Sequence, residues 1–217
     1  ARHGHWRYEA TVGAGLPVIS TLRDLIDTGD EVRAIDGILS GTLSYLFNAY
    51  DGTRPFSELL LEARQLGYTE PDPRIDLSGK DVARKILILA REAGFMLEFE
   101  EVEIVNFLPG KVFKTKDIES LWTALEAYDA EFDVLRTRIE KEKKKLRLVA
   151  SFDGKAAKVE LREFTQDHPF YNLEGSDSIV LFYTDRYPKN PLVVKGAGAG
   201  AEVTAAGVFA DVIRLKG

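Results

Sequence analysis

The sequence predicts a single α+β domain, built on a mixed β-sheet that carries its helices on one face. Amphipathic patterns with helical spacing dominate residues 17–145, whereas alternating patterns typical of strands dominate residues 146–195. Helical runs followed by strand runs indicate segregated helices and strands rather than regular β-α-β alternation. The length of 217 residues allows one large domain, and 45% hydrophobic with 29% charged residues is typical of a globular protein.

Proline and glycine mark the expected ends of the helices. Pro17 and Pro55 suit a first helical turn, where a backbone N–H is not needed. Gly29, Gly67 and Gly94 stand where helices are expected to stop. The expected helices are 17–28, 42–50, 55–66, 81–93, 117–145 and 203–215. The fourth of these is apolar almost all round, so we expect it at the centre of the fold.

Most of the expected strands lie in the second half of the chain. Asp153-Gly154, between two alternating runs, is a strong signal for a tight hairpin turn. The expected strands are 31–39, 146–152, 155–164, 178–185 and 192–195. We expect the helix-free face of the sheet to be apolar and exposed, and such a face usually marks a partner surface. The simplest closed arrangement is a two-fold homodimer joined through that face.

The composition argues against several kinds of partner. A net charge of -6 argues against binding to nucleic acid or to an anionic membrane. The chain has no cysteine, so disulfides and thiol chemistry are excluded. No apolar run is long enough to span a bilayer, and the first residues lack the apolar core of a signal peptide. His3, His5 and His168 have no partners at metal-ligand spacing, and we interpret them as surface residues.

Charged side chains gather around one helix start, within residues 63–85. Asp81 and Lys85 are four apart in an expected helix, so they share one face of its first two turns. Glu70 and Asp76 lie in the proline-containing loop that leads into the same helix. Three carboxylates and one ammonium group placed in this way suit a small zwitterionic ligand or a proton transfer.

The same residues also have a purely structural interpretation. Asp81 follows Ser78 at capping-box spacing, so it can cap the helix, and Lys85 can form an i,i+4 ion pair with Asp81. Gly41 and Thr42 lie between a strand and a helix, where a cap is ordinary. The residues taken alone favour this structural interpretation over a functional one.

Three blocks of the sequence together resemble the homoserine dehydrogenases. One runs from Tyr8 to Pro17, and another from Gly196 to Gly200 with Val203–Val208 after it. The densest block lies between them, and its matching residues are Ala63, Gly67, Tyr68, Thr69, Asp72, Pro73, Asp76, Leu77, Gly79, Asp81 and Lys85. Ile75 departs from the pattern, because the family often has a second Asp at that position.

The resemblance implies an NAD(P)-dependent enzyme that interconverts L-homoserine and L-aspartate 4-semialdehyde, in the aspartate-derived synthesis of threonine and methionine. It implies that Lys85 and Asp81 are catalytic, with Lys85 giving a proton to the alkoxide while carboxylates hold its charge. Glu70 and Asp76 would accept the cationic amine of the substrate. The other residues implied at the substrate are Gly41, Thr42 and Tyr68.

Two glycine-rich turns carry the remaining implied sites. At the first turn the resemblance implies a monovalent cation, Na⁺ or K⁺, held by Glu9, Val12, Ala14 and Leu16. Oxygen-only ligation suits a hard cation, whereas Glu9 taken alone is equally an exposed carboxylate at a strand end. Backbone amides at the second turn, residues 196–200, favour anions. The resemblance implies that this loop meets the NAD or NADP cofactor, with Gly200 closest.

The family begins with a dinucleotide-binding domain, but no strand, G-x-G-x-x-G turn and helix open this chain. We therefore expect residues 1–217 to form one substrate-binding and dimerisation domain, separate from the cofactor domain and inactive alone. Residues 196–217 would return toward that domain. The expected location is the cytoplasm, or the plastid in a plant. The alternative is a non-enzymatic dimerisation or amino-acid-binding domain that kept the ancestral pocket.

Overall fold

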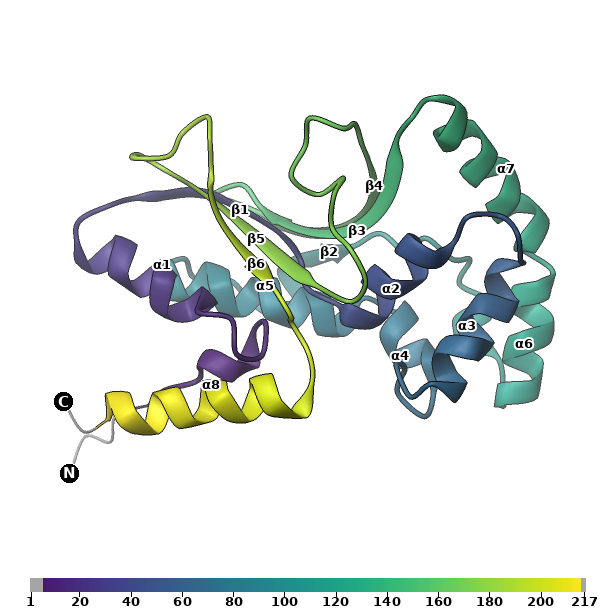
Figure 1. Ribbon diagram of the computed structural model, residues 1–217, viewed down its shortest axis with the longest axis horizontal. Coiled ribbons are helices and arrows are strands. Elements are labelled where there is room, and N and C mark those ends of the chain that lie inside the picture. The colour runs from purple at the N-terminus through teal and green to yellow at the C-terminus, as the bar shows by residue number, and fades with distance from the viewer. Residues whose placement is uncertain (1–5, 216–217) are drawn as a thin grey trace.

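The computed structural model describes residues 6–215, and six strands there form one mixed sheet in the order β2-β4-β3-β1-β5-β6 (Figure 1). β2 runs parallel to β4, and the other neighbouring pairs are antiparallel. The strands are β1 (Val32–Ile38), β2 (Val102–Ile104), β3 (Lys145–Phe152), β4 (Ala157–Phe164), β5 (Ser178–Thr184) and β6 (Leu192–Gly196). The predicted α+β class is confirmed.

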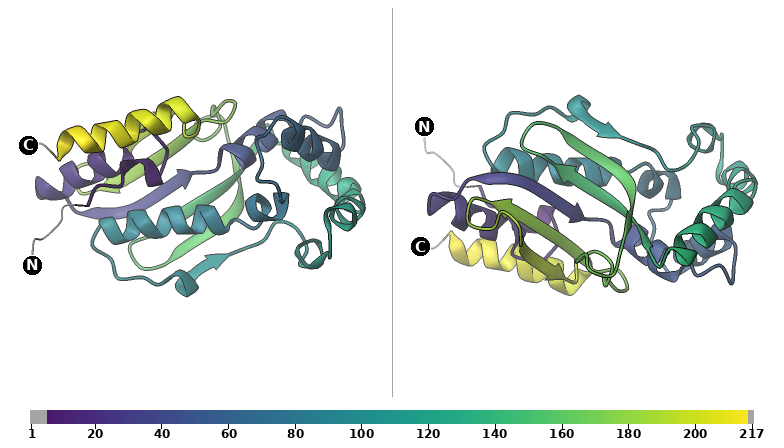
Figure 2. Two further views of the ribbon diagram at one scale, coloured as in Figure 1. Left: turned by 90° about the horizontal axis from the view of Figure 1, so that it is seen from below. Right: turned by 90° about the horizontal axis from the view of Figure 1, so that it is seen from above.

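The helices lie along one face of the sheet and beyond one of its ends. They are α1 (Val18–Asp27), α2 (Gly41–Ala49), α3 (Phe56–Gln65), α4 (Pro73–Leu77), α5 (Lys80–Glu92), α6 (Ile118–Glu126), α7 (Asp129–Lys141) and α8 (Ala201–Arg214). α5 packs against β1, β2, β3 and β4, and it buries Ile86, Leu89 and Ala90 completely, so its predicted central place is confirmed. Figure 2 shows α3, α6 and α7 gathered beyond the end of the sheet. No helix within residues 6–215 has the length and apolar character to cross a membrane.

The helix-free face of the sheet is not the wide apolar surface that the sequence predicts. A long loop, residues 165–177, folds back over part of this face and covers a second small core. That core contains Ile38, Val149, Phe164, Phe170, Leu173, Ile179 and Leu181. The fully buried Arg147 of β3 holds the loop by donating to the carbonyls of Phe170, Tyr171 and Leu173. The expectation of an exposed apolar face is therefore wrong, and the homodimer itself stays a prediction.

The long helix predicted over residues 117–145 is two helices, α6 and α7, which meet at Ala127 and Tyr128. Asp129, just after the break, accepts hydrogen bonds from the backbone N of Ser57 (2.9 Å) and its hydroxyl (2.5 Å), and so caps the start of α3. The buried residues Leu121, Leu125, Phe132 and Ile139 continue one apolar stripe across the break. That stripe is why the sequence pattern suggests a single helix.

Three smaller features also differ from the sequence analysis. The proline-containing loop before α5 includes the short helix α4, which Asp72 caps by accepting a hydrogen bond from the backbone N of Arg74. The three-residue strand β2 is too short to show an alternating pattern. The β3–β4 connection has four residues instead of a two-residue turn, because Phe152 pairs with Ala157. The Asp153 carboxylate stabilises this wider turn by accepting from the backbone N atoms of residues 155 and 156.

Candidate active site

A cavity of ≈ 510 Å³ opens where the start of α2, the loop after α3, the start of α5 and the β6–α8 loop converge. Its lining residues are Ser40, Gly41, Thr42, Gly67, Tyr68, Thr69, Glu70, Asp76, Asp81, Lys85, Ser176, Gly198, Ala199 and Gly200. All eight residues predicted at the substrate, the catalytic pair and the cofactor are among them. The volume is in the usual range for small-molecule sites. The sequence therefore predicted correctly which of these residues share one place, while their roles stay predictions.

Lys85 is the ammonium group of this cavity. Its Nζ lies 2.8 Å from Asp81 Oδ2 and donates to the backbone carbonyl of Leu39 at 2.8 Å, just past the end of β1. An ammonium group has three donors, so these two contacts leave one for a ligand. The Lys85 side chain is 20% exposed and that of Asp81 55%, which places the pair at the wall of the cavity.

The predicted ion pair between Asp81 and Lys85 is confirmed, but the cap predicted from Ser78 and Asp81 is wrong. Gly79 is the N-cap of α5, with φ of 67°, and no side chain caps this helix. The nearest polar contact is from the backbone N of Lys80 to Ser78 Oγ, at 3.3 Å. Because Asp81 is not engaged in capping, its carboxylate is available to position Lys85.

Asp76 is the most tightly held carboxylate of the cavity. Its Oδ2 accepts a hydrogen bond from the backbone N of Glu70 (2.9 Å), and its Oδ1 lies 3.0 Å from Thr42 Oγ1. The Thr42 hydroxyl also lies 2.6 Å from the backbone carbonyl of Tyr68, so the two acceptors share its one proton. Burial raises the pKa of Asp76, an effect that outweighs the lowering by its hydrogen bonds with the backbone N of Glu70 and the hydroxyl of Thr42. In this arrangement Asp76 fixes the loop that carries Glu70.

Glu70 is the carboxylate that the protein leaves free at the cavity. It is exposed, and its side-chain oxygens accept no hydrogen bond from any residue between 6 and 215. The neighbouring Tyr68 packs its ring on Tyr45, with 4.7 Å between the ring centroids. A rigid backbone under an unpaired carboxylate is a suitable acceptor for a cationic amine.

The β6–α8 loop closes another wall of the cavity and requires glycine. A Cβ on Gly198 would lie 1.9 Å from Ser178 Oγ, so only glycine permits this close approach. Gly200 is the N-cap of α8, which means that the free backbone N–H groups of the first turn of α8 lie next to the cavity. Such groups favour a negatively charged ligand.

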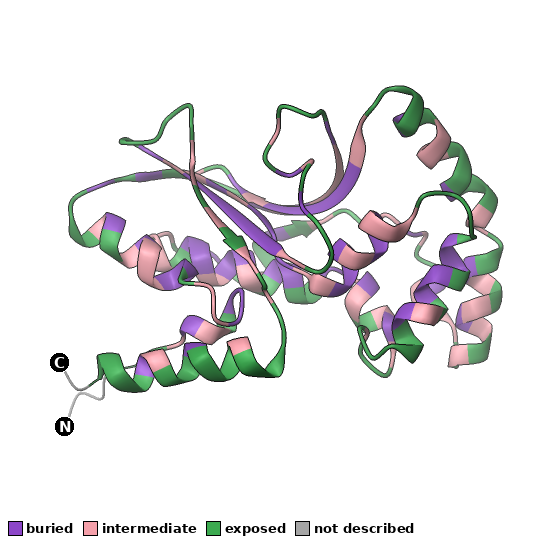
Figure 3. Ribbon diagram, viewed as in Figure 1, coloured by how far each residue is buried: buried purple, intermediate pink, exposed green. Residues whose placement is uncertain are grey.

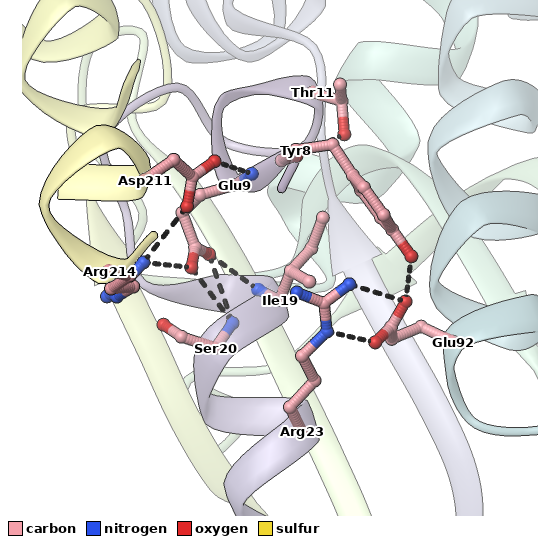
Figure 4. A network of polar contacts seen from close by, with 9 residues as sticks. All are labelled: Tyr8, Glu9, Thr11, Ile19, Ser20, Arg23, Glu92, Asp211 and Arg214. Atoms are coloured by element: carbon pink, nitrogen blue, oxygen red, sulfur yellow. Dashed lines mark hydrogen bonds and ion pairs between the residues drawn. The ribbon is translucent and has the colours of Figure 1, made fainter. Parts of the chain in front are cut away.

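Glu9 lies in a separate cluster that joins the two ends of the chain (Figure 4). Only 4% of this residue is exposed, in a 3₁₀ turn over Glu9–Thr11, so the interpretation as an exposed strand-end carboxylate is wrong. Its Oε1 accepts from the backbone N of Ile19 (2.7 Å), and its Oε2 accepts from Ser20 N and Arg214 Nη1, both at 3.0 Å. Asp211 accepts from the Glu9 backbone N at 2.8 Å.

The Glu9 carboxylate is already engaged by groups of the protein itself. The partners of the Glu9 carboxylate are all hydrogen-bond donors, and the Arg214 guanidinium already supplies the positive charge beside it. The backbone carbonyl of Leu16 is engaged as well, since it accepts from the backbone N of Val18 at 2.8 Å. Within residues 6–215, no group of three or more His, Asp or Glu could hold a metal ion. Cation binding by Glu9, Val12, Ala14 and Leu16 therefore stays a prediction.

The chain matches a known protein family over most of its length. The family described as homoserine dehydrogenase matches residues 17–213, a range that includes every lining residue of the cavity. The chain belongs to the homoserine dehydrogenase family.

Relatives in this family come from plants and fungi. The Zea mays protein "Bifunctional aspartokinase/homoserine dehydrogenase 2, chloroplastic" is 50% identical over 217 residues, covering 99% of this chain and 24% of that protein. The homoserine dehydrogenase of Schizosaccharomyces pombe is 48% identical over 216 residues, covering 96% of this chain and 57% of that one. This chain thus spans about a quarter of the plant protein and little more than half of the fungal one.

Solved structures show the same fold. A Candida auris protein of unknown function superposes with a TM-score of 0.89 and 46% identity, covering 95% of this chain and 60% of that one. A putative homoserine dehydrogenase from Archaeoglobus fulgidus gives a TM-score of 0.75 and 28% identity, covering 96% and 57%. The mixed sheet with its helices on one face is therefore an arrangement shared within the homoserine dehydrogenase family.

Sequence reasoning missed several contributors to the site. The Leu39 carbonyl that accepts from Lys85 is a backbone group, so the residue type at this position does not indicate it. Ser176 is brought to the cavity by the long loop over the sheet. The ion pair of Glu9 with Arg214 joins residues 205 positions apart, which no local pattern could reveal. Of the histidines, His168 is half-buried between the rings of Phe164 and Phe170. His3 and His5 lie outside the described residues.

Proposed function

We propose that this chain is the substrate-binding and catalytic domain of an NAD(P)-dependent homoserine dehydrogenase, which interconverts L-homoserine and L-aspartate 4-semialdehyde. The observation that carries the proposal is that Lys85, Asp81, Glu70 and Asp76 line one cavity in a chain of this family. Relatives as similar as the Schizosaccharomyces pombe protein are named homoserine dehydrogenase. Neither that protein nor the Zea mays relative is named as a non-enzymatic binding domain, so no observation favours that alternative.

In this proposal each charged group has one task. Glu70 binds the α-amine of the substrate, and Asp76 keeps Glu70 in place through its backbone N. Lys85 gives its proton to the alkoxide when the aldehyde is reduced, and takes a proton from the alcohol in the opposite direction. Asp81 orients the Lys85 ammonium and stabilises its charge. Gly41 and Thr42 fix the start of α2 beside the substrate.

The cofactor that this reaction needs is NAD or NADP, whose nicotinamide supplies or removes the hydride. A hyperthermophilic archaeal homoserine dehydrogenase with 25% identity and a TM-score of 0.70 is described in complex with NADPH. The loop at Gly200 fits such an anionic group, because the free N–H groups at the start of α8 lie next to the cavity. We assign this chain the wall of the site that faces the nicotinamide.

α8 is the element that we expect to contact a dinucleotide-binding domain. It is mostly exposed (Figure 3), and its large apolar residues Val208, Phe209, Val212 and Ile213 are 47–65% exposed. An apolar stripe of this kind usually marks a partner surface. We further propose that residues 1–217 act as one domain, that the protein is a homodimer, and that it is located in the cytoplasm, or in the plastid if its source is a plant. The named Zea mays relative is described as chloroplastic.

The proposal is tested with the full-length protein, by following NADP-linked oxidation of L-homoserine by absorbance. D-homoserine and L-serine are matched controls, because one has the wrong configuration and the other a shorter chain. We expect turnover with L-homoserine alone, and none from purified residues 1–217. Equal turnover of all three alcohols would contradict the substrate assignment, and activity of the isolated segment would contradict the need for a separate cofactor domain.

A further inference from the structure

A second cavity of ≈ 440 Å³ lies away from the candidate active site and shares no lining residue with it. It opens between the ends of α2 and α7, the start of β3 and the loop over the sheet. Its lining residues are Phe47, Asn48, Tyr50, Asp51, Arg136, Ile139, Glu140, Lys143, Lys144, Lys145, Leu146, Gln166 and Tyr171. The volume again suits a small molecule.

The lining of this cavity has more basic than acidic side chains, although the chain carries a net charge of -6. Both acidic residues of the lining are already engaged: Glu140 forms an ion pair with Arg136 at 2.7 Å, and Asp51 accepts from the backbone N of Thr53 at 2.9 Å. By contrast, Lys143 and Lys145 form no ion pair with any carboxylate between residues 6 and 215. Two ammonium groups are therefore available to an anion.

Lys143 stands where the backbone favours glycine. Its φ is 55°, in the left-handed region, and it is the first residue after the C-cap of α7. The backbone N of Lys143 donates to Glu140 O (2.9 Å) and that of Lys144 to Ile139 O (3.0 Å), which is the Schellman arrangement usually completed by glycine. A lysine here carries a conformational cost that glycine would avoid, which suggests that the side chain has a use.

The other walls are apolar and aromatic. Phe47, Ile139 and Leu146 are buried, and the rings of Tyr50 and Tyr171 are half-buried. The Lys145 ammonium lies 4.9 Å from the centre of the Tyr171 ring, so charge and aromatic surface adjoin.

We propose that this cavity binds a small aromatic carboxylate, with the carboxylate on Lys143 and Lys145 and the ring against Tyr50 and Tyr171. The combination of two available ammonium groups with three apolar and two aromatic walls matches a ligand that has an anionic end and a flat apolar body. A phosphate ion would use the lysines alone and leave the apolar walls hydrated. A neutral aromatic compound would leave both ammonium groups unpaired.

The two cavities are physically connected through α2 and the long loop. The start of α2 lines the candidate active site, and its end lines the second cavity. Asn48, at that end, donates to the carbonyl of Gly175 at 2.9 Å and accepts from Arg147 at 2.9 Å. Ser44 donates to the carbonyl of Asp177 at 3.1 Å. Gly175 and Asp177 flank Ser176, which lines the candidate active site, so a ligand in the second cavity should also restrain that loop.

The test is calorimetric titration of the full-length protein with phenylacetate, compared with inorganic phosphate and benzyl alcohol. We expect saturable binding of phenylacetate alone, and saturating L-homoserine should not displace it. Lys145→Gln should weaken it about tenfold and the exposed Lys143→Gln about threefold. Lys141→Gln, which removes the same charge from the last residue of α7, outside the cavity, should change affinity less than twofold. Lys143→Gly should weaken binding while leaving the protein at least as stable, since glycine suits this backbone.

The proposal would be overturned by the absence of saturable phenylacetate binding, by displacement of phenylacetate by L-homoserine, or by equal loss of affinity in Lys145→Gln and Lys141→Gln. Stronger binding of inorganic phosphate than of phenylacetate would also reject the aromatic carboxylate as the ligand. Hydrogen exchange tests the connection independently of enzyme activity: phenylacetate should slow exchange in residues 40–45 and 174–178. Unchanged exchange in both segments would show that the cavity does not communicate with the candidate active site.

Discussion

Two clusters of charged residues in this chain look alike in sequence but differ in how far the protein satisfies them. At Glu9, both carboxylate oxygens accept hydrogen bonds from α1 amides and one also accepts from Arg214. At the cavity, Glu70 accepts none from the described residues, and Lys85 keeps one donor free. A satisfied buried carboxylate contributes mainly to stability, whereas an unsatisfied one is ready for a ligand. This difference supports the proposal that the cavity is the catalytic site, and we expect the Glu9 cluster to contribute to stability.

The Glu9 cluster also explains how the two ends of the described chain stay together. Glu9 contacts α1, while Asp211 and Arg214 belong to α8 (Figure 4). Beside it, Tyr8 and Arg23 both donate to Glu92 of α5, so the early segment is tied to the central helix as well. Apart from these contacts α8 buries little, since only Gly207 and Asp211 of this helix are buried. The polar cluster is thus a main anchor of α8.

The largest effect that the comparison predicts is at Lys85. Lys85→Ala in the full-length enzyme should lower turnover about 10²–10⁴-fold, because a positioned acid–base group contributes that much. The Michaelis constant for L-homoserine should change little. Steady-state kinetics measure both quantities, and Lys80→Ala, an exposed lysine on the same helix, is the matched control. Unchanged turnover would reduce Lys85 to a structural partner of Asp81.

The complementary change is Glu9→Gln, which should reduce stability and leave turnover nearly unchanged. Replacing one carboxylate oxygen by an amide group places a donor against donors, which costs about 2–3 kcal/mol in the free energy of unfolding. Urea unfolding measures this difference. The exposed Glu31→Gln serves as the control and should stay within about 0.5 kcal/mol of the parent. A large loss of turnover in Glu9→Gln, with stability preserved, would reverse the roles of the two clusters.

Glu70→Gln should act on binding rather than on stability. Loss of the charged acceptor should raise the Michaelis constant for L-homoserine about tenfold, because a hydrogen bond between charged groups is worth that much. Turnover and the unfolding midpoint should stay close to those of the parent, because the Glu70 side chain makes no hydrogen bond or ion pair within residues 6–215. Glu58→Gln, in α3, is an exposed control. If Glu70→Gln changed only the unfolding midpoint, the loop would be structural and the amine site would lie elsewhere.

The cation of the added salt tests whether Arg214 or a metal ion pairs with Glu9. While Arg214 pairs with Glu9, potassium chloride should stabilise the protein no more than choline chloride at the same ionic strength. Arg214→Ala leaves Glu9 without its cation, so this variant should unfold at a higher temperature in potassium than in choline. Thermal unfolding in matched salts measures the difference. Specific stabilisation of the parent protein by potassium would instead support the cation that the family resemblance implies at Glu9.

Features with local signals in the sequence were predicted correctly, and features that depend on a distant contact were not. Helices that stop at Gly29 and Gly67 lie where they were expected, and the residues of the cavity between 68 and 85 are close in sequence as well as in space. Two features that depend on contacts between distant residues were not predicted. The α6–α7 break places Asp129 over the start of α3, and the loop over the sheet depends on the buried Arg147. Neither contact leaves a mark on the apolar pattern, so periodicity alone could not predict it.

The smallest expected effect is on the pH dependence of stability, and it differs between two aspartates that are four residues apart. Burial raises the pKa of Asp76, whereas the hydrogen bonds from the Arg74 side chain lower the pKa of Asp72. A folded-state pKa above the unfolded value means that the folded protein binds the proton more tightly. The parent should therefore gain stability relative to Asp76→Asn as the pH falls from 7 through the raised pKa, with the gain complete below the ordinary value of 3.8.

Asp72→Asn is the matched variant and should behave in the opposite way. The stability that Asp72 contributes is present above its ordinary pKa of 3.8, and is lost as the pH falls through the lowered value. Asparagine can still cap α4 at this position, and at position 76 it can still accept from the backbone N of Glu70. Urea midpoints of the parent and both variants between pH 7 and low pH therefore isolate the two charges. If the urea midpoints of the parent and both variants changed in parallel with pH, neither carboxyl group would have a different pKa in the folded and unfolded protein. If the stability difference between parent and variant changed with pH in the same direction for both aspartates, Asp76 would be held as an ion-pair partner rather than as a buried support for the Glu70 loop.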